Sequence, residues 1–220
     1  MHKKIFNDRY SLILHNEKEK IELKNDWNTR YQSKEFVYGK EPNAFFKEEI
    51  DRLTPGKILL PAEGEGRNAV YAAKKGWEVH CFDWSEEGKR KADQFAEMEG
   101  VKINYIVSEI ADFDFKESEY DAVALVFVHL PEEEREELHK NVIKALKPGG
   151  KLIFTAYDKT QLGKSSGGPK QIELLYSLAQ IVEDFIDLDF DIFAKETVEL
   201  NEGTLHVGGA DMIKFSGSKK

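Results

Sequence analysis

From Lys57 onward the sequence alternates short apolar runs with longer amphipathic stretches, and this alternation constrains the fold more than any other feature. Short apolar runs are typical of strands covered on both faces, while the amphipathic stretches have the length and apolar spacing of helices. We expect strands at 57–61, 77–83, 101–107, 120–128 and 151–157, with helices at 67–75, 85–100 and 132–146 between them. This order predicts an α/β fold built on a doubly wound, mostly parallel sheet.

The C-terminal part departs from this alternation. Residues 158–169 read as a polar, glycine-rich loop, and a helix is expected from about 170 to 185. Extended segments at 189–200 and 204–215 meet at Asn201-Glu202-Gly203, which is typical of a hairpin turn. The sheet is therefore predicted to end in an antiparallel pair.

The first 55 residues are expected to be mostly helical, and they contain the aromatic residues Trp27, Tyr31 and Tyr38. A chain of 220 residues suits one large domain. We therefore interpret residues 1–55 as a helical N-terminal cover over the carboxyl edge of the sheet, and residues 56–220 as the main body of the same domain.

Composition excludes several classes of function. The chain has 41 acidic and 32 basic side chains, a formal charge of −9, which argues against a nucleic acid partner. The longest apolar run, Ala122 to Val128, is too short to span a bilayer, and residues 1–20 show no secretory signal. The single cysteine, Cys81, excludes an internal disulfide and a cysteine cluster for metal. We expect a soluble, cytoplasmic protein without metal; its oligomeric state is not readable from the sequence.

The strongest sign of a ligand lies between the first strand and the first helix. There Gly64, Gly66 and Ala69 satisfy the G-x-G-x-x-A form of the dinucleotide fingerprint. Glycines let the backbone approach a ligand closely, and the following helix offers free N–H groups to an anion. The alternative is a tight strand–helix turn that binds nothing.

Two acidic positions support a bound nucleoside. Asp83 ends the second strand and should lie beside the glycine loop, where a carboxylate accepts hydrogen bonds from ribose hydroxyls; Trp84 follows and could lie against an adenine face. After the third strand, the segment 109–112 could flank an adenine with an apolar side chain and an acid. The alternatives are a helix cap for Asp83 and a solvated acidic loop for 109–112.

These elements, in this order, resemble the class I S-adenosylmethionine-dependent methyltransferases. The motifs are Gly64-Glu65-Gly66, Asp83, Tyr120-Asp121-Ala122-Val123 and Leu146-Lys147-Pro148-Gly149-Gly150. Finer similarity is to the tellurite-resistance and thiopurine methyltransferase branch. It rests on Trp27-Asn28-Thr29-Arg30-Tyr31, Tyr38-Gly39-Lys40-Glu41-Pro42-Asn43, Gly64 to Ala72, Gly167-Gly168-Pro169 and His206-Val207-Gly208.

The resemblance implies a seven-stranded sheet with an antiparallel last strand, and methyl transfer from S-adenosylmethionine to a small molecule. The residues expected to bind the cofactor are Trp27, Tyr31, Tyr38, Glu63, Gly64, Gly66, Arg67, Asn68, Asp83, Trp84, Ser85, Glu109, Ile110, Ala111 and Phe127. The rings of Trp27, Tyr31 and Tyr38 are placed near the sulfonium, which aromatic faces stabilise. For each of these rings, ordinary packing of an N-terminal helix is the alternative.

The chain departs from the family pattern D-x-G-x-G-x-G. Leu60 stands at the position of the acid and Ala62 at that of the first glycine, with Glu63 just before Gly64. Glu63 could take over the contact with the cofactor's ammonium group. Weaker cofactor binding would instead fit an adaptor, which a Gly66→Asp variant should leave unaffected while it abolishes an enzyme's activity. A third hypothesis is an NAD-dependent oxidoreductase, since the glycine loop and Asp83 fit both cofactors, but the chain has no room for a separate substrate domain.

Methyl transfer from a sulfonium is an in-line displacement that mainly requires alignment and exclusion of water. A soft nucleophile such as a thiol or tellurite needs no general base, whereas a hydroxyl or amine could need one. His129, just past the fourth strand, and His206, on the last strand, are the candidate catalytic residues. The alternatives are a structural or cofactor-shell histidine at 129 and an exposed strand residue at 206. The Gly167-Gly168-Pro169 loop could act as a lid.

Overall fold

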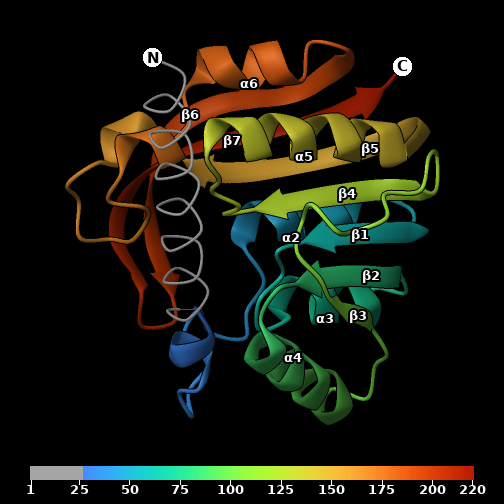
Figure 1. Ribbon diagram of the computed structural model, residues 1–220, viewed down its shortest axis with the longest axis vertical. Coiled ribbons are helices and arrows are strands. Elements are labelled where there is room, and N and C mark those ends of the chain that lie inside the picture. The colour runs from blue at the N-terminus through green and yellow to red at the C-terminus, as the bar shows by residue number, and fades with distance from the viewer. Residues whose placement is uncertain (1–26) are drawn as a thin grey trace, which may run out of the picture.

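The computed structural model describes residues 27–220, which form a seven-stranded sheet with helices on both faces (Figure 1). The sheet order is β3-β2-β1-β4-β5-β7-β6. The strands are β1 (Lys57–Pro61), β2 (Glu78–Asp83), β3 (Asn104–Val107), β4 (Tyr120–Val126), β5 (Leu146–Tyr157), β6 (Leu188–Glu202) and β7 (His206–Lys219).

Strand pairing determines where the order of the parallel strands reverses. β1 is parallel to both β2 and β4, β5 is parallel to β4, and β7 is antiparallel to β5 and β6. The predicted doubly wound sheet with an antiparallel last strand is confirmed. The strand order reverses between β1 and β4, and open α/β sheets bind ligands at the carboxyl ends of the strands at such a point. The antiparallel end also differs from the strand order of dinucleotide-binding dehydrogenases.

Two apolar cores lie on opposite faces of the sheet. α2 (Ala44–Arg52), α3 (Arg67–Lys74) and α4 (Glu86–Met98) pack on one face; α5 (Glu132–Ala145) and α6 (Leu178–Asp184) pack on the other. Because side chains alternate along a strand, the buried neighbours Leu59 and Leu60 belong to different cores. Figure 1 shows α5 in front of the sheet and α2 and α3 behind it.

The N-terminal segment divides into two parts. Residues 27–31 are helical, 32–43 form turns and loop, and α2 then packs on a face of the sheet through Phe45, Phe46 and Ile50. The stretch before α2 lies at the carboxyl end of β1, where the backbone N–H of Val37 donates to the Glu65 carboxylate (2.9 Å). The cover over the carboxyl edge is thus limited to the residues before α2. Residues 1–26 of the expected cover lie outside the described residues.

The predicted helix at 170–185 is wrong in its first half. A 3₁₀ turn, η2 (Ile172–Leu174), is followed by α6, which begins only after Ser177. Ser177 and Gln180 form a capping box, and the backbone of Tyr176 bridges to Asp158 instead of continuing a helix. The loop after β5 also contains a 3₁₀ turn, η1 (Lys159–Gln161).

The hairpin turn lies two residues further along the chain than predicted. Its strands pair up to Glu202 and His206, which leaves 203–205 as the turn, with Gly203 at a φ of 63°. The same glycine presses against the N-terminal segment, because a Cβ there would lie 2.3 Å from the carbonyl oxygen of Val37. Glu202 and His206 are thereby cross-strand partners at the tip of the hairpin.

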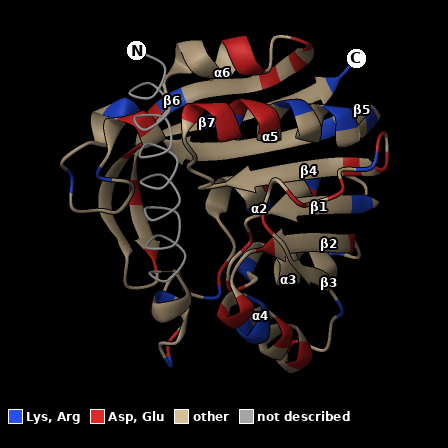
Figure 2. Ribbon diagram, in the orientation of Figure 1, with Lys and Arg blue, Asp and Glu red and all other residues tan. Residues whose placement is uncertain are grey.

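Charged residues follow the helix dipoles. Glu86 and Glu87 lie in the first turn of α4, and acidic residues also fill the first turn of α5, as the red segments in Figure 2 show. Along the described chain, Lys and Arg are interspersed with Asp and Glu (Figure 2). Of the helices described, none is long and apolar enough to cross a membrane.

Candidate active site

The loop between β1 and α3 keeps a glycine-like backbone despite its altered sequence. Ala62 has a φ of 52°, Gly64 of 61° and Gly66 of 87°, all in the left-handed region. Ala62 therefore adopts the conformation that glycine favours, at a cost of about 1 kcal/mol.

Glu63 serves as the cap of α3. One of its carboxylate oxygens accepts hydrogen bonds from the backbone N–H groups of Asn68 (2.9 Å) and Ala69 (2.7 Å), while the N-cap residue, Gly66, has no side chain to do so. Burial raises the pKa of Glu63 to about 7, against the opposing effect of these N–H groups. The carboxylate expected to contact the ammonium group of the cofactor is thus engaged with the helix in this structure.

Asp83 lies beside the glycine loop, as expected. One carboxylate oxygen accepts from the backbone N–H of Gly64 (3.0 Å) and the other from that of Ser85 (2.9 Å). Burial raises the pKa of Asp83 to about 6. Ser85 is fully buried; its hydroxyl caps α4 by accepting from Gly88 N–H (3.0 Å) and donates to the amide oxygen of Asn28 (2.6 Å). Ser85 thus holds α4 and the N-terminal segment together.

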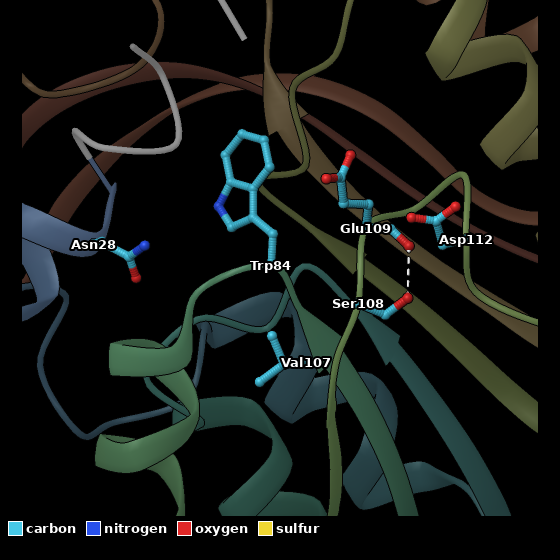
Figure 3. Close-up of a pocket in the computed structure, with 6 residues that line it drawn as sticks. All are labelled: Asn28, Trp84, Val107, Ser108, Glu109 and Asp112. Carbon is cyan, nitrogen blue, oxygen red and sulfur yellow. Dashed lines mark hydrogen bonds between the residues drawn. The ribbon is translucent and has the colours of Figure 1, made fainter. Parts of the chain in front are cut away.

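A cavity of about 340 Å³ opens beside Trp84, the residue that follows Asp83 in the sequence (Figure 3). In Figure 3, Trp84 stands between Asn28 on one side and Ser108, Glu109 and Asp112 on the other. The Ser108 hydroxyl donates to the carbonyl oxygen of Glu109 (2.9 Å). The residues that line the cavity are Asn28, Trp84, Val107, Ser108, Glu109 and Asp112.

This lining agrees only in part with the sequence prediction. Trp84 and Glu109 are brought together as expected. Ile110 instead packs against the core beneath α5, and Ala111 is exposed on a turn, so neither lines the cavity. The apolar side chain comes from Val107, the last residue of β3, which the sequence reading missed. Its position at the carboxyl end of a predicted strand was the available signal.

The aromatic residues of the N-terminal segment lie over the glycine loop. The ring centroid of Trp27 is 5.5 Å from that of Tyr31 and 6.1 Å from that of Tyr38. Arg30 lies over Trp27, 4.3 Å from its centroid, and donates to the Tyr38 hydroxyl (3.0 Å). A Cβ on Gly64 would lie 2.6 Å from the Tyr31 hydroxyl, so this ring closes directly on the loop.

A second aromatic cluster surrounds His206. The centroid of its imidazole lies 4.5 Å from Tyr38, 4.6 Å from Phe127 and 5.6 Å from Tyr157. Phe127, just past β4, has a φ of 57°. The glycine-rich loop after β5 closes this cluster, because a Cβ on Gly167 would lie 2.5 Å from the Tyr157 hydroxyl. Phe127 therefore belongs to the cluster around His206 and does not line the cavity of Figure 3.

The two candidate histidines differ in their surroundings. At His129, Nδ1 lies 2.7 Å from the carbonyl oxygen of Leu174 and Nε2 lies 3.4 Å from the backbone nitrogen of Tyr157. Burial lowers its pKa to about 4. Both nitrogens are engaged with the backbone, which fits the structural alternative and leaves no nitrogen for proton transfer. His206 instead pairs through Nδ1 with Glu202 (3.1 Å to Oε2) and is buried, not exposed.

Arg67 and Asn68 tie the N-terminal segment to the loop. Arg67 donates to the carbonyl oxygen of Tyr38 (3.1 Å) and to Glu202 (2.9 Å), and the side-chain oxygen of Asn68 accepts from the backbone of Asn43 (2.9 Å). Neither lines the cavity of Figure 3. Glu202 is a further candidate site residue that the sequence did not lead us to expect; its place four residues before His206, on either side of a hairpin turn, was the signal.

In the part of the chain that is described, no group of three or more His, Cys, Asp or Glu residues is arranged to hold a metal ion. The chemistry of the site suits a nucleoside with a cationic group. Carboxylates and an indole converge with the glycine loop at one sheet edge, beside a cluster of aromatic rings.

Comparison with known proteins gives consistent results. Residues 58–150 match the family described as Methyltransferase domain. A ubiquinone biosynthesis O-methyltransferase of Rickettsia conorii is 29% identical over 118 residues, 54% of this chain and 40% of that protein. A thiopurine S-methyltransferase of Vibrio cholerae is 29% identical over 127 residues, 51% of this chain and 58% of that protein. The chain thus spans about half the length of the curated relatives it matches.

Similarity in three dimensions extends further along the chain. The crystal structure of TehB from Haemophilus influenzae has a TM-score of 0.67 at 18% identity and covers 90% of this chain and 67% of that one. The shared fold therefore includes elements outside residues 58–150.

Proposed function

Because this chain carries a class I S-adenosylmethionine-dependent methyltransferase domain, we propose that it transfers a methyl group from S-adenosylmethionine to a small molecule with a soft nucleophile, such as a thiol or tellurite. S-adenosylmethionine is the cofactor of this family, and it supplies a methyl group on a sulfonium. The predicted resemblance to the family, including its thiopurine and tellurite-resistance members, is confirmed.

The observation that carries the proposal is the cavity beside Trp84 (Figure 3). Trp84 supplies an aromatic face for adenine, and the Asp83 carboxylate lies at the glycine loop, where ribose hydroxyls need an acceptor. The buried Tyr31 ring lies directly against this loop, because a Cβ on Gly64 would lie 2.6 Å from its hydroxyl. Carboxylates and the rings of Trp27 and Tyr31 suit a cation through Coulomb and cation–π attraction.

The cluster around His206 is the proposed acceptor end. Phe127, Tyr157 and Tyr38 offer an apolar surface that excludes water, which favours displacement at a sulfonium. The preference for a soft acceptor is supported by the thiopurine S-methyltransferase among the relatives and by the fold shared with TehB. The segments around this end, 27–43, 158–169 and 201–208, are short, which favours a small acceptor.

Ligand binding is tested first by thermal unfolding with S-adenosylmethionine, S-adenosylhomocysteine or NAD. A ligand at about 100 times its dissociation constant stabilises the fold by roughly 2.7 kcal/mol, a shift of several degrees. We expect the shift with the two adenosyl ligands and not with NAD. An Asp83→Asn variant should lose most of it, whereas Asp114→Asn, at an exposed position, should keep it.

Activity is then tested with methyl-labelled S-adenosylmethionine and a panel of thiols and tellurite. Labelled product from any of them supports the proposal. Binding without transfer to any acceptor would favour the adaptor hypothesis, and stabilisation by NAD alone would favour an oxidoreductase.

A further inference from the structure

Glu202 is a buried carboxylate at the acceptor end of the site. Its Oε2 lies 3.1 Å from Nδ1 of His206 and 2.9 Å from a guanidinium nitrogen of Arg67, and its Oε1 accepts from the side-chain amide of Asn43 (3.1 Å). Only 14% of the Glu202 side chain and 8% of the His206 side chain are exposed. The carboxylate and the imidazole are thus held in one geometry, in contact with each other and away from bulk water.

The rest of the His206 ring faces the aromatic cluster. Phe127 and Tyr157 meet it edge-to-face, and a Cβ on Gly167 would lie 2.8 Å from Cδ2, the ring carbon next to Nε2. Among the described residues, Nε2 has no hydrogen-bond partner, whereas Nδ1 has Glu202. The ring therefore turns one nitrogen to the carboxylate and the other toward the proposed acceptor end.

A carboxylate at Nδ1 fixes the tautomer of a histidine. Nδ1–H donates to the carboxylate, so the lone pair stays on Nε2, where it can accept a proton. Burial alone would raise the pKa of Glu202, but the hydrogen bond from His206 and the charge and hydrogen bonds of Arg67 lower it, so this carboxyl is ionised at neutral pH. Burial lowers the pKa of His206 and Arg67 opposes its charging, while Glu202 acts in the opposite direction. The imidazole is thereby neutral and able to act as a base.

We propose that Glu202 is a positioning residue that holds His206 as a general base, and that the acceptor therefore carries a proton on its nucleophilic atom, as an alkyl thiol does. This inference rests on the proposed methyltransferase function. The acceptor's heteroatom bonds to the methyl carbon while the carbon–sulfur bond of the sulfonium breaks, with its electron pair left on sulfur. The proton of the acceptor passes to Nε2 of His206 and then to water.

The groups that determine the charge of His206 come from several elements. Glu202 ends β6, Arg67 begins α3, Arg30 and Tyr38 belong to the N-terminal segment, and Tyr157 ends β5. The neighbouring His129 is held neutral by burial. Glu202 is the one carboxylate in this set, so removing its charge should act on His206 directly.

The first test is an NMR titration of the His206 ring in the wild type, in Glu202→Gln and in Glu199→Gln. Glu199 lies on the same strand with its side chain exposed, which makes it a matched control. We expect Glu202→Gln to lower the pKa of His206 and to weaken the preference for protonated Nδ1, with no change in Glu199→Gln. An unchanged tautomer and pKa in Glu202→Gln would overturn the proposal without any measurement of activity.

The second test compares two acceptors: 2-mercaptoethanol, which is mostly protonated at neutral pH, and a nitro-substituted thiophenol, which is already a thiolate. Because general bases contribute about 10²–10⁴-fold, Glu202→Gln and His206→Gln should slow methylation of the alkyl thiol at least about tenfold and that of the thiolate less than about threefold. His206→Gln leaves the Arg67–Glu202 pair in place, so it reports on the base even where Glu202→Gln folds poorly. Glu199→Gln should match the wild type with both acceptors.

The outcomes separate the base from a purely structural tie between the hairpin and the N-terminal segment. Equal losses with both acceptors would mean that the pair only shapes the site, and would overturn the proposal. If the wild-type protein methylated the thiolate but not the alkyl thiol, the proposal would also be overturned, but the methyltransferase function would stand. No turnover of either, despite binding of S-adenosylmethionine, would refute the proposed function and this inference with it.

Discussion

The structure predicts a specific loss of folding stability when Gly66 is replaced. Its φ is 87°, and a Cβ there would lie 2.6 Å from Cβ of Ala92 and 3.0 Å from Cα of the same residue. Carbon atoms pack at about 3.5–4.0 Å, and Ala92, buried on α4, has no side chain that could rotate away. Gly66→Ala must therefore move a helix or the cofactor loop.

The expected cost has two parts. The left-handed backbone costs a non-glycine residue about 1–2 kcal/mol, and overpacking costs about 1–3 kcal/mol more. We expect Gly66→Ala to lower the free energy of unfolding by about 2–5 kcal/mol, measured by urea denaturation followed by circular dichroism. In a protein of this size each kcal/mol lowers the melting temperature by about 2–4 °C.

Gly100→Ala is the matched control. Gly100 has a φ of 68°, but a Cβ there would meet nothing within 4 Å, so only the backbone cost of about 1–2 kcal/mol applies. Equal losses in the two variants would refute the argument that close approach to α4 requires Gly66. The same geometry weakens Gly66→Asp as a test of enzyme against adaptor, because a larger side chain would unfold both.

Three further predictions concern other parts of the site. Lys91→Met should cost about 3–5 kcal/mol in urea denaturation, because it leaves the buried Glu65 carboxylate without its cation; a loss below about 1 kcal/mol would contradict this. Glu63 has a pKa of about 7 in the folded protein against an ordinary 4.5, so the folded protein loses stability as pH rises through this range. The stability of Glu63→Gln should therefore depend less on pH, and relative to the wild type it should gain up to about 3 kcal/mol between pH 4 and pH 8; parallel profiles of stability against pH would refute this. Trp84→Ala should weaken S-adenosylmethionine binding in calorimetry by about 1–3 kcal/mol, the usual worth of stacking, and an unchanged affinity would place adenine elsewhere.

The sheet was predictable because its signals are local. The strand Lys57–Pro61 is bounded as predicted, since a short apolar run between a glycine and a glycine-rich loop can only be a buried strand in this context. The hairpin was predicted from its turn residues, but its register depends on how Gly203 docks against Val37, a contact between segments far apart in sequence. The prediction of a helix at 170–185 was wrong for a similar reason, because Tyr176 forms a β-bridge with Asp158.

The candidate site also combines features that the sequence could predict with features that depend on contacts between distant segments. Asp83 and the glycine loop meet because strand ends are adjacent in a doubly wound sheet, which a sequence pattern can foresee. The contacts of His129 and Glu202 could not be foreseen, because they depend on which backbone and side-chain groups the fold brings to each one. The ring nitrogens of His129 contact backbone atoms of Leu174 and Tyr157. Glu202 contacts Arg67, which is separated from it by more than half of the sequence.

At Leu60, where the family pattern has an acid, other carboxylates hold the loop. Leu60 is buried in the core beneath α2 and α3, where an ionised acid would be costly without a partner. The loop instead carries Glu63, which satisfies the first turn of α3, and Glu65, which accepts from the backbone of Val37 and from Lys91. Because carboxylates fix the loop from both sides and Ala62 keeps its left-handed turn, the replaced acid and glycine are poor evidence for lost cofactor binding. The adaptor hypothesis then depends on the contacts of the ammonium group alone, since Glu63, the carboxylate expected to meet it, is engaged in capping α3.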